Sequence, residues 1–75
     1  MNLTKLKKGK FFFISKYALN GAEIFKMMEL GILPKIKMYI MQRNLFGSFI
    51  IKCNGNKYAL DTNLAKKLTV SSIAD

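Results

Sequence analysis

A corner between Gly31 and Pro34 sets the tightest limit on the folds open to this chain. A helical pattern runs up to Leu30 and stops at Gly31, and Pro34, the only proline, follows three residues later. Glycine readily adopts the left-handed backbone that ends many helices, and proline fixes its own φ and cannot continue a helix. The corner therefore predicts a helix that turns at a set angle into an extended segment.

The helix before this corner carries a clear start signal. It is expected over residues 19–31, where Asn20 can cap the first turn and Glu23 can reach back to it as in a capping box. The spacing divides the side chains into one broad apolar arc and one charged arc. The apolar arc holds Ile24, Phe25, Met27 and Met28, and the charged arc holds Glu23, Lys26 and Glu29. The segment is therefore an amphipathic helix that covers a core.

The rest of the chain is typical of short strands joined by tight turns. Strands are expected at residues 10–15, 35–43, 48–53, 56–60 and 69–70, a loop at 44–47, helical turns at 3–9 and after Asp61, which caps its turn, and a frayed tail at 71–75. Asn54 and Gly55 form a strong hairpin signal because both accept a positive φ. The pattern predicts a mainly β fold, a small barrel of about five strands with one well-formed helix and one or two short helical turns. The residues expected to close the barrel are Phe13, Ile36, Met38, Ile40, Phe49, Ile51 and Leu60.

Length and charge bound the class of protein. The 75 residues form one domain, residues 1–75, and apolar residues at 51% favour a folded core. The formal net charge of +9 favours an anionic partner, with a solvated surface that aids solubility as the alternative. The single cysteine, Cys53, excludes an internal disulfide, and no apolar run is long enough to span a membrane. We expect a soluble cytoplasmic protein.

The residues of common catalytic and metal sites are missing. The chain has no histidine, which removes the usual zinc and haem ligand sets. Glu23 and Glu29 point in different directions on the helix and Asp61 has a capping position, so no carboxylate pair is available for acid–base chemistry. Cys53 lies in a strand pattern, which favours a buried hydrophobe over a nucleophile. We expect no enzymatic activity, no cofactor and no metal site.

Two patterns leave alternatives open. Methionines could supply soft ligands to a monovalent metal, although thioethers also fill gaps in small cores. Aromatic side chains interleaved with lysines could stack bases in a nucleic-acid-binding small β-barrel, although core packing of the aromatics explains the same pattern. The methionines are Met27, Met28, Met38 and Met41, and the second set is Phe11, Phe12, Phe13, Tyr39 and Tyr58 among Lys8, Lys10, Lys37 and Lys57.

Several short motifs follow one another in a recognisable order. They are an opening LxxLxxG (Leu3, Leu6, Gly9), a helix end at residues 26–34 (KMMELGILP) like RLxxLGLxP, a hairpin glycine (Gly55), an exit at Ala59 and Leu60, and a closing AxxIxV-like segment at residues 65–70 (AKKLTV). In this order and spacing the chain resembles the bacterial ferrous-iron transport protein A (FeoA) family over nearly its full length.

The chain departs from the family pattern at a few positions. Lys35 stands where the family usually has glycine after the proline, which predicts a type I rather than a type II turn. Lys26 and Met27 replace the usual Arg-Leu, and Asp61 replaces a common arginine. These changes leave the fold intact and put any arginine-dependent partner contact in doubt.

The resemblance implies an SH3-like barrel with a helix packed across it. It also implies a cytosolic accessory role, since family members are thought to bind and modulate the membrane ferrous-iron permease, whose cytosolic part is a GTP-binding domain. The same barrel type ends iron- and manganese-dependent repressors, and the absence of a DNA-binding helical domain from this sequence argues against a repressor. Fold alone does not support the transport assignment; the motif order does.

The helix and corner are the expected contact with the permease. The residues chosen are Met27, Leu30, Ile32 and Pro34, with burial as the alternative for Met27 and Ile32. Lys7, Lys8 and Lys10 are expected to steer the protein toward an acidic permease surface or the anionic inner face of the cell membrane. No small-molecule substrate is expected, and hydrophobic edges on so short a barrel permit pairing between copies.

Overall fold

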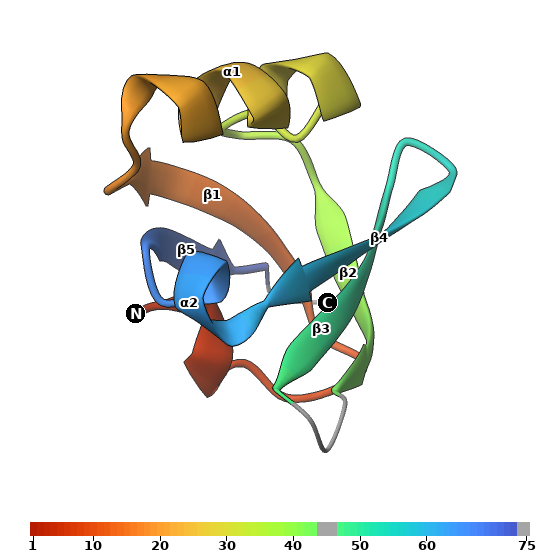
Figure 1. Cartoon of the computed structure of the whole chain (residues 1–75). Coiled ribbons are helices and arrows are strands. Elements are labelled where there is room, and N and C mark those ends of the chain that lie inside the picture. Colours follow the sequence, from red (N-terminus) through yellow and green to blue (C-terminus); the bar gives the residue numbers. More distant parts are fainter. Residues whose placement is uncertain (44–46, 74–75) are drawn as a thin grey trace.

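A computed structural model describes residues 1–43 and 47–73 as a curved sheet crossed by one helix (Figure 1). Five antiparallel strands form a single sheet in the order β4-β3-β2-β1-β5. The strands are β1 (Phe11–Tyr17), β2 (Met38–Arg43), β3 (Ser48–Cys53), β4 (Asn56–Asp61) and β5 (Leu68–Ser72), and the helical elements are the 3-10 helix η1 (Leu3–Lys5), α1 (Gly21–Leu30) and α2 (Thr62–Ala65). The predicted mainly β fold is confirmed.

Register shifts in two pairings help the sheet to coil. The register slips in β1 between Ile14 and Lys16 opposite β5, and in β2 between Ile40 and Gln42 opposite β3. An extra residue on one strand bends it and increases its twist, which lets so few strands curl into a barrel. α2 leads from the edge strand β4 toward β5, and Asp61 caps it as predicted by accepting a hydrogen bond from the Leu64 backbone N–H at 2.7 Å.

The core inside the curved sheet is apolar throughout the described residues. Its buried members are Leu3, Leu6, Phe12, Ile14, Met27, Ile32, Met38, Ile40, Phe49, Ile51, Cys53, Leu60, Ala65, Leu68 and Val70. The prediction that Phe13 helps to close the barrel was wrong by one position, because β1 buries Phe12 and Ile14 and leaves Phe13 half-buried. Three consecutive phenylalanines show no alternation from which the facing could be read. Ile36 is also only half-buried, packed against the core from outside.

α1 lies across one end of the barrel, above β1 (Figure 1). Asn20 accepts a hydrogen bond from the Glu23 N–H at 2.8 Å, and the Glu23 carboxylate accepts one from the Asn20 N–H at 3.0 Å, which confirms the capping box. Gly31 ends the helix with a φ of 78°, in the left-handed region as predicted. Met27 is its only buried residue. The helix is therefore well defined but rests on the core through little of its surface.

The corner after α1 is a turn, so the strand predicted from Lys35 begins only at Met38. The Ile36 N–H donates to the Leu33 carbonyl at 3.4 Å, and Lys35 has a φ of 69°. Proline at the second turn position followed by a positive φ is the pattern of a type II turn, so the expected type I turn was wrong. A positive φ also cannot belong to an extended strand.

The chain end pairs further than predicted. β5 reaches Ser72, and the Ile73 N–H donates to the Phe11 carbonyl at 2.9 Å, so frayed backbone is absent up to Ile73. The loop predicted at 44–47 lies, except for Gly47, outside the described residues. In the described part of the chain, no helix has the length and apolar character needed to cross a membrane.

Candidate functional site

Side chains from three different strands contact the backbone carbonyls of the last residue of α1 and of the two residues after it. The Tyr58 hydroxyl on β4 donates to the Leu30 carbonyl at 2.8 Å. The Tyr17 hydroxyl on β1 donates to the Ile32 carbonyl at 2.6 Å, and the Cys53 thiol on β3 approaches the Gly31 carbonyl at 3.6 Å. Carbonyls at a helix end lack intrahelical partners. These contacts supply partners and fix α1 to the barrel at the corner.

Two of the donors at this corner, Tyr17 and Cys53, have pKa values that favour their protonated forms. Burial, with a smaller contribution from the nearby Cys53, raises the pKa of Tyr17 above its ordinary value. Burial likewise raises the pKa of the Cys53 thiol. A low-dielectric site disfavours a phenolate or thiolate, and only the neutral groups can donate to a carbonyl. The sequence signal for this role was weak, since tyrosine and cysteine in strands are ordinary core residues.

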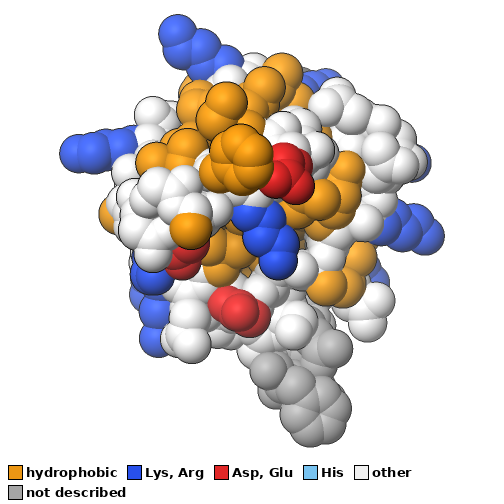
Figure 2. All heavy atoms as spheres, turned by 45° about the horizontal axis from the view of Figure 1, so that its top comes forward, with side chains coloured by type: hydrophobic (Ala, Val, Ile, Leu, Met, Phe, Trp, Pro, Cys, Tyr) orange, Lys and Arg blue, Asp and Glu red, His pale blue; other side chains and the backbone are white. Residues whose placement is uncertain are grey.

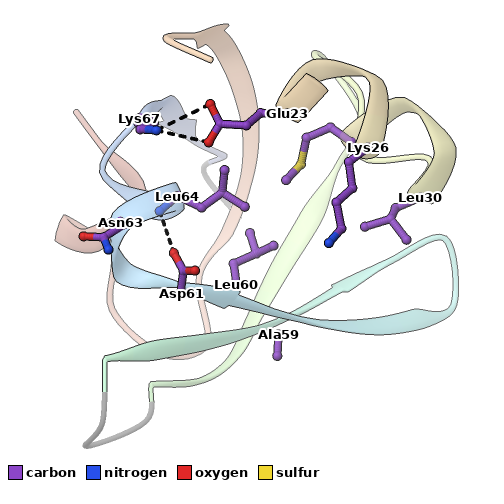
Figure 3. Close-up of a pocket in the computed structure, with 10 residues that line it drawn as sticks. Glu23, Lys26, Leu30, Ala59, Leu60, Asp61, Asn63, Leu64 and Lys67 are labelled. Atoms are coloured by element: carbon purple, nitrogen blue, oxygen red, sulfur yellow. Dashed lines mark hydrogen bonds and ion pairs between the residues drawn. The ribbon is translucent and has the colours of Figure 1, made fainter. Parts of the chain in front are cut away.

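The opposite end of α1 is attached by charge. Lys67 lies 3.1 Å from a Glu23 carboxylate oxygen, and this is the one ion pair recorded within residues 1–43 and 47–73 (Figure 3). The Asn20 backbone N–H, followed by Lys67, lowers the pKa of Glu23 below its ordinary value. α1 is thus fastened at both ends, and between them Met27 packs into the core.

A groove runs between α1 and the edge formed by β4 and α2. It encloses about 320 Å³ and is lined by Glu23, Lys26, Met27, Leu30, Ala59, Leu60, Asp61, Asn63, Leu64 and Lys67. In Figure 3, Leu30 and Lys26 enter it from the helix, and Leu60 and Leu64 from the opposite side. Half of the lining residues are apolar, and the others are Asn63 and charged side chains of both signs. This arrangement suits a side chain of a protein partner better than a charged small molecule.

Large apolar side chains project from the outer side of the helix and corner. Phe25 is 64% exposed, Met28 57% and Leu33 37%. Figure 2 shows hydrophobic atoms gathered on the face that carries α1, with charged side chains among them. We call Phe25, Met28, Leu30, Leu33 and Pro34 the helix patch. Exposed apolar clusters of this kind mark interaction surfaces on soluble proteins.

The structure divides the predicted contact residues into two pairs. Leu30 lines the groove and is half-buried, and Pro34 is exposed, so both remain accessible. Met27 is 1% exposed and Ile32 is not exposed at all, so the expectation that they present a surface is corrected. Ile32 is drawn inward because its N–H closes on the Met27 carbonyl at 2.9 Å while Tyr17 holds its carbonyl.

Phe25 and Met28 were missed as surface residues because the apolar arc is wider than the face that the barrel covers. Ile24 and Met27 form one stripe at i and i+3, and Phe25 and Met28 form the neighbouring stripe. This short helix on a small barrel covers only the first stripe, with Met27 buried and Ile24 half-buried. The width of the arc was the available signal, since a helix that is apolar over more than its contact face must expose the excess.

The remaining predicted groups do not gather into a chemical centre. Lys7, Lys8 and Lys10 are all exposed around Gly9. Met27 and Met38 belong to the core, whereas Met28 is exposed on α1 and Met41 lies on the outer wall of β2. Among the described residues, no three His, Cys, Asp or Glu side chains come together as metal ligands would.

Comparison with known proteins identifies the fold and the family. The sequence model of the FeoA domain matches residues 1–72, and no curated protein sequence matches the chain. The solved FeoA protein from Chlorobium tepidum is 27% identical with a TM-score of 0.90, covering 99% of this chain and 71% of its own. Iron(II) transport protein A from Clostridium thermocellum is 22% identical with a TM-score of 0.88, covering 97% of this chain and 46% of its own.

A regulator shares the same barrel. The metal-dependent transcriptional regulator MtsR is 16% identical with a TM-score of 0.87, covering 97% of this chain but only 34% of its own. At that identity the likeness concerns the fold alone. The SH3-like barrel and the resemblance seen in the sequence motifs are both confirmed. Because the family model extends over nearly the whole sequence, this chain belongs to the FeoA domain family.

Proposed function

We propose that this protein is an accessory protein of ferrous-iron uptake that docks on the cytosolic GTP-binding part of a membrane iron permease and modulates it. Membership of the FeoA family associates the chain with iron uptake. The relative from Clostridium thermocellum is an iron(II) transport protein, although this chain spans less than half of it. The permease as partner rests on the family resemblance together with the surface described above.

The observation that carries the proposal is the exposure of Phe25 and Met28 on a helix fastened at both ends. A large aromatic side chain anchors many protein interfaces, and methionine adapts to irregular partner surfaces. Because α1 is already fixed by Tyr17, Tyr58 and the Glu23–Lys67 pair, docking orders little backbone and loses little conformational entropy. The helix patch is therefore preorganised for a partner.

The groove beside the patch supports the same use. Leu30 belongs to both, so a partner that covers Phe25 and Met28 can place an apolar side chain between Leu30 and Leu64. Its rim holds Glu23 and Asp61 as well as Lys26 and Lys67, so it does not select strongly for one sign of charge. An apolar centre inside a mixed polar rim is the usual layout of a protein interface.

Binding to the isolated GTP-binding domain of the cognate permease tests the proposal. Titration calorimetry compares the wild type with Leu30→Asp and with the double variant Phe25→Ser/Met28→Ser. We expect each to weaken binding by roughly tenfold or more, as truncation of interface anchors does. The rate of GTP hydrolysis by the domain, measured with and without saturating protein, reports whether docking modulates it.

Met41→Ser is the matched control, because Met41 lies on the barrel wall away from α1. It should bind the domain as the wild type does, and circular dichroism should show all variants folded. Undiminished binding by the Phe25→Ser/Met28→Ser variant, or no binding by the wild type, would reject the helix patch as the docking surface.

A further inference from the structure

One cross-strand row on the outer wall of the barrel combines two aromatic rings with two lysines. Phe11 on β1 pairs with Tyr39 on β2. Tyr39 pairs in turn with Lys52 on β3, and Lys52 pairs with Lys57 on β4. Directly opposed residues share one face of a sheet. We call these four residues the barrel-wall row; with neighbouring strands about 4.8 Å apart, it spans about 14 Å.

The aromatic half of the row opens into a groove. The rings of Phe11 and Tyr39 have centroids 4.8 Å apart and are tilted by 51°. The Lys37 ammonium lies 4.4 Å from the centroid of the Phe11 ring. The groove encloses about 710 Å³ and is lined by Gly9, Phe11, Lys37, Met38, Tyr39, Met41, Lys52 and Asn54. This volume is within the range of ligand sites. Its lining combines the Tyr39 ring with the Phe11 ring, over which the Lys37 ammonium is placed.

The lysine half of the row places two like charges opposite each other. Lys52 and Lys57 are both exposed and stand directly opposite each other. Like charges in that position destabilise a strand pair. Over residues 1–43 and 47–73 neither has a carboxylate within ion-pair distance. The acids of that part are Glu23 and Glu29 on α1 and Asp61, the last residue of β4, which caps α2. An anion bound across this pair would relieve the repulsion.

We propose that the barrel-wall row binds single-stranded nucleic acid, with bases on the Phe11–Tyr39 half and phosphates on Lys37, Lys52 and Lys57. Aromatic platforms beside a cationic track are how proteins bind single strands without sequence preference. The row shares no residue with the helix patch, so it is a further activity and does not depend on the proposed docking.

Two other anionic partners fit the row less well. A bilayer needs apolar side chains that protrude, but Phe11 and Tyr39 are half-buried in a hollow, and the protruding apolar residues stand on α1 instead. An acidic peptide would satisfy Lys52 and Lys57 and leave the aromatic half unused. A strand of nucleotides uses both halves, because each unit carries a base and a phosphate.

Fluorescence anisotropy of a labelled 12-nucleotide oligothymidylate, measured with the full chain at 20 and 200 mM salt, tests the proposal. The double variant Lys52→Gln/Lys57→Gln should bind roughly tenfold more weakly at low salt and show a salt slope smaller by roughly one to two units. Tyr39→Leu, which keeps the wall apolar, should lose about fivefold or more from stacking without changing the salt slope.

The matched control is Lys5→Gln/Lys66→Gln, which removes the same charge from η1 and from the end of α2. It should change affinity by less than twofold, and thermal unfolding should show every variant folded. Equal weakening by both lysine pairs would mean a diffuse positive surface and overturn the proposal, as would an absence of binding at 20 mM salt. Tighter binding of polyglutamate, or of vesicles containing phosphatidylglycerol, would overturn it in favour of those partners.

Discussion

The groove under α1 and the groove in the barrel wall differ in the charges that lie beside their apolar side chains. The groove under α1 has Glu23 and Asp61 among its lining, matched by lysines, around an apolar centre. The groove in the barrel wall has Lys37 and Lys52 and no carboxylate. Binding at the first should depend on buried apolar area and little on salt, and binding at the second strongly on salt. The net charge of +9 alone does not distinguish these surfaces; the position of each lysine does.

The largest expected effect is a difference in stability between two variants, one in the buried side of the corner and one in the exposed helix patch. Ile32→Ala should lower the free energy of unfolding by about 2–5 kcal/mol, because Ile32 is fully buried and its loss leaves a cavity. Phe25→Ala should change it by no more than about 0.5 kcal/mol, since most of that ring is in solvent. Urea unfolding measures both. A similar cost for the two variants would contradict the assignment of Phe25 to the helix patch.

Loss of the Tyr17 hydroxyl tests whether α1 is held by its carbonyls. Tyr17→Phe removes the donor to the Ile32 carbonyl and should lower the free energy of unfolding by about 1–3 kcal/mol. Hydrogen exchange of the α1 amides should accelerate more than that of β3, because the tether belongs to the helix end. Uniform acceleration over both elements would point instead to general loosening of the core.

The same tether predicts a pH dependence in the alkaline range. The pKa of Tyr17 is raised in the folded protein, so the unfolded chain loses this proton first. The contribution of Tyr17 is therefore complete below its ordinary pKa near 10.0 and is lost as the pH rises through the folded value. Thermal unfolding from pH 8 to 11 should show a fall in melting temperature that is smaller in Tyr17→Phe. An equal fall in both proteins would assign the effect to Cys53 and other groups.

Lys35 offers a smaller gain in stability at the corner. Its positive φ costs a residue other than glycine about 1–2 kcal/mol. Glycine would remove this strain, but the greater freedom of glycine in the unfolded chain would offset part of the gain in stability. Lys35→Gly should therefore raise the free energy of unfolding by about 0.5–1 kcal/mol without altering the helix patch. A loss of stability would mean that the Lys35 side chain makes a contact worth more than the strain.

Local sequence signals predicted the helices and strands of this fold. Where apolar and polar residues do not alternate clearly, the buried face of a strand could not be predicted. The capping box at Asn20, the glycine end at Gly31 and the cap at Asp61 could be read directly because each depends on a few adjacent residues. The facing of β1 could not, since Phe11, Phe12 and Phe13 are alike and only the tertiary fold decides which one enters the core. The turn at Lys35 was misread because a lysine accepts there the conformation that glycine usually supplies.

The candidate site was harder to predict, because the exposure of a residue on the helix or corner depends on how the barrel packs against it and not on the helix alone. Leu30 and Pro34 are accessible and stay predicted contact residues, whereas Ile32 is buried beside a long-range hydrogen bond from Tyr17 that no local sequence pattern indicates. The barrel-wall row was only partly visible. Phe11 and Tyr39 stood among interleaved lysines, but the opposition of Lys52 and Lys57 follows from the register of the hairpin.

The smallest expected effect is the change in stability when one charge is removed from each surface. Lys57→Gln should raise the free energy of unfolding by about 0.2–1 kcal/mol at low salt, because it ends the repulsion across β3 and β4. The gain should shrink at 1 M salt, where the screening length falls to about 3 Å. Chemical unfolding by urea, which adds no charge, measures both.

Glu23→Gln is the counterpart on the α1 side, since it keeps an acceptor for the capping box and loses the ion pair with Lys67. It should lower stability at neutral pH. The pKa of Glu23 is lowered in the folded protein, so its contribution is present above the ordinary value near 4.5 and disappears as the pH falls through the folded value. A loss of stability in Glu23→Gln and a gain in Lys57→Gln would show that charges are paired within the fold at α1, whereas the lysines of the barrel-wall row repel each other. Equal signs would remove the electrostatic basis for treating them as different sites.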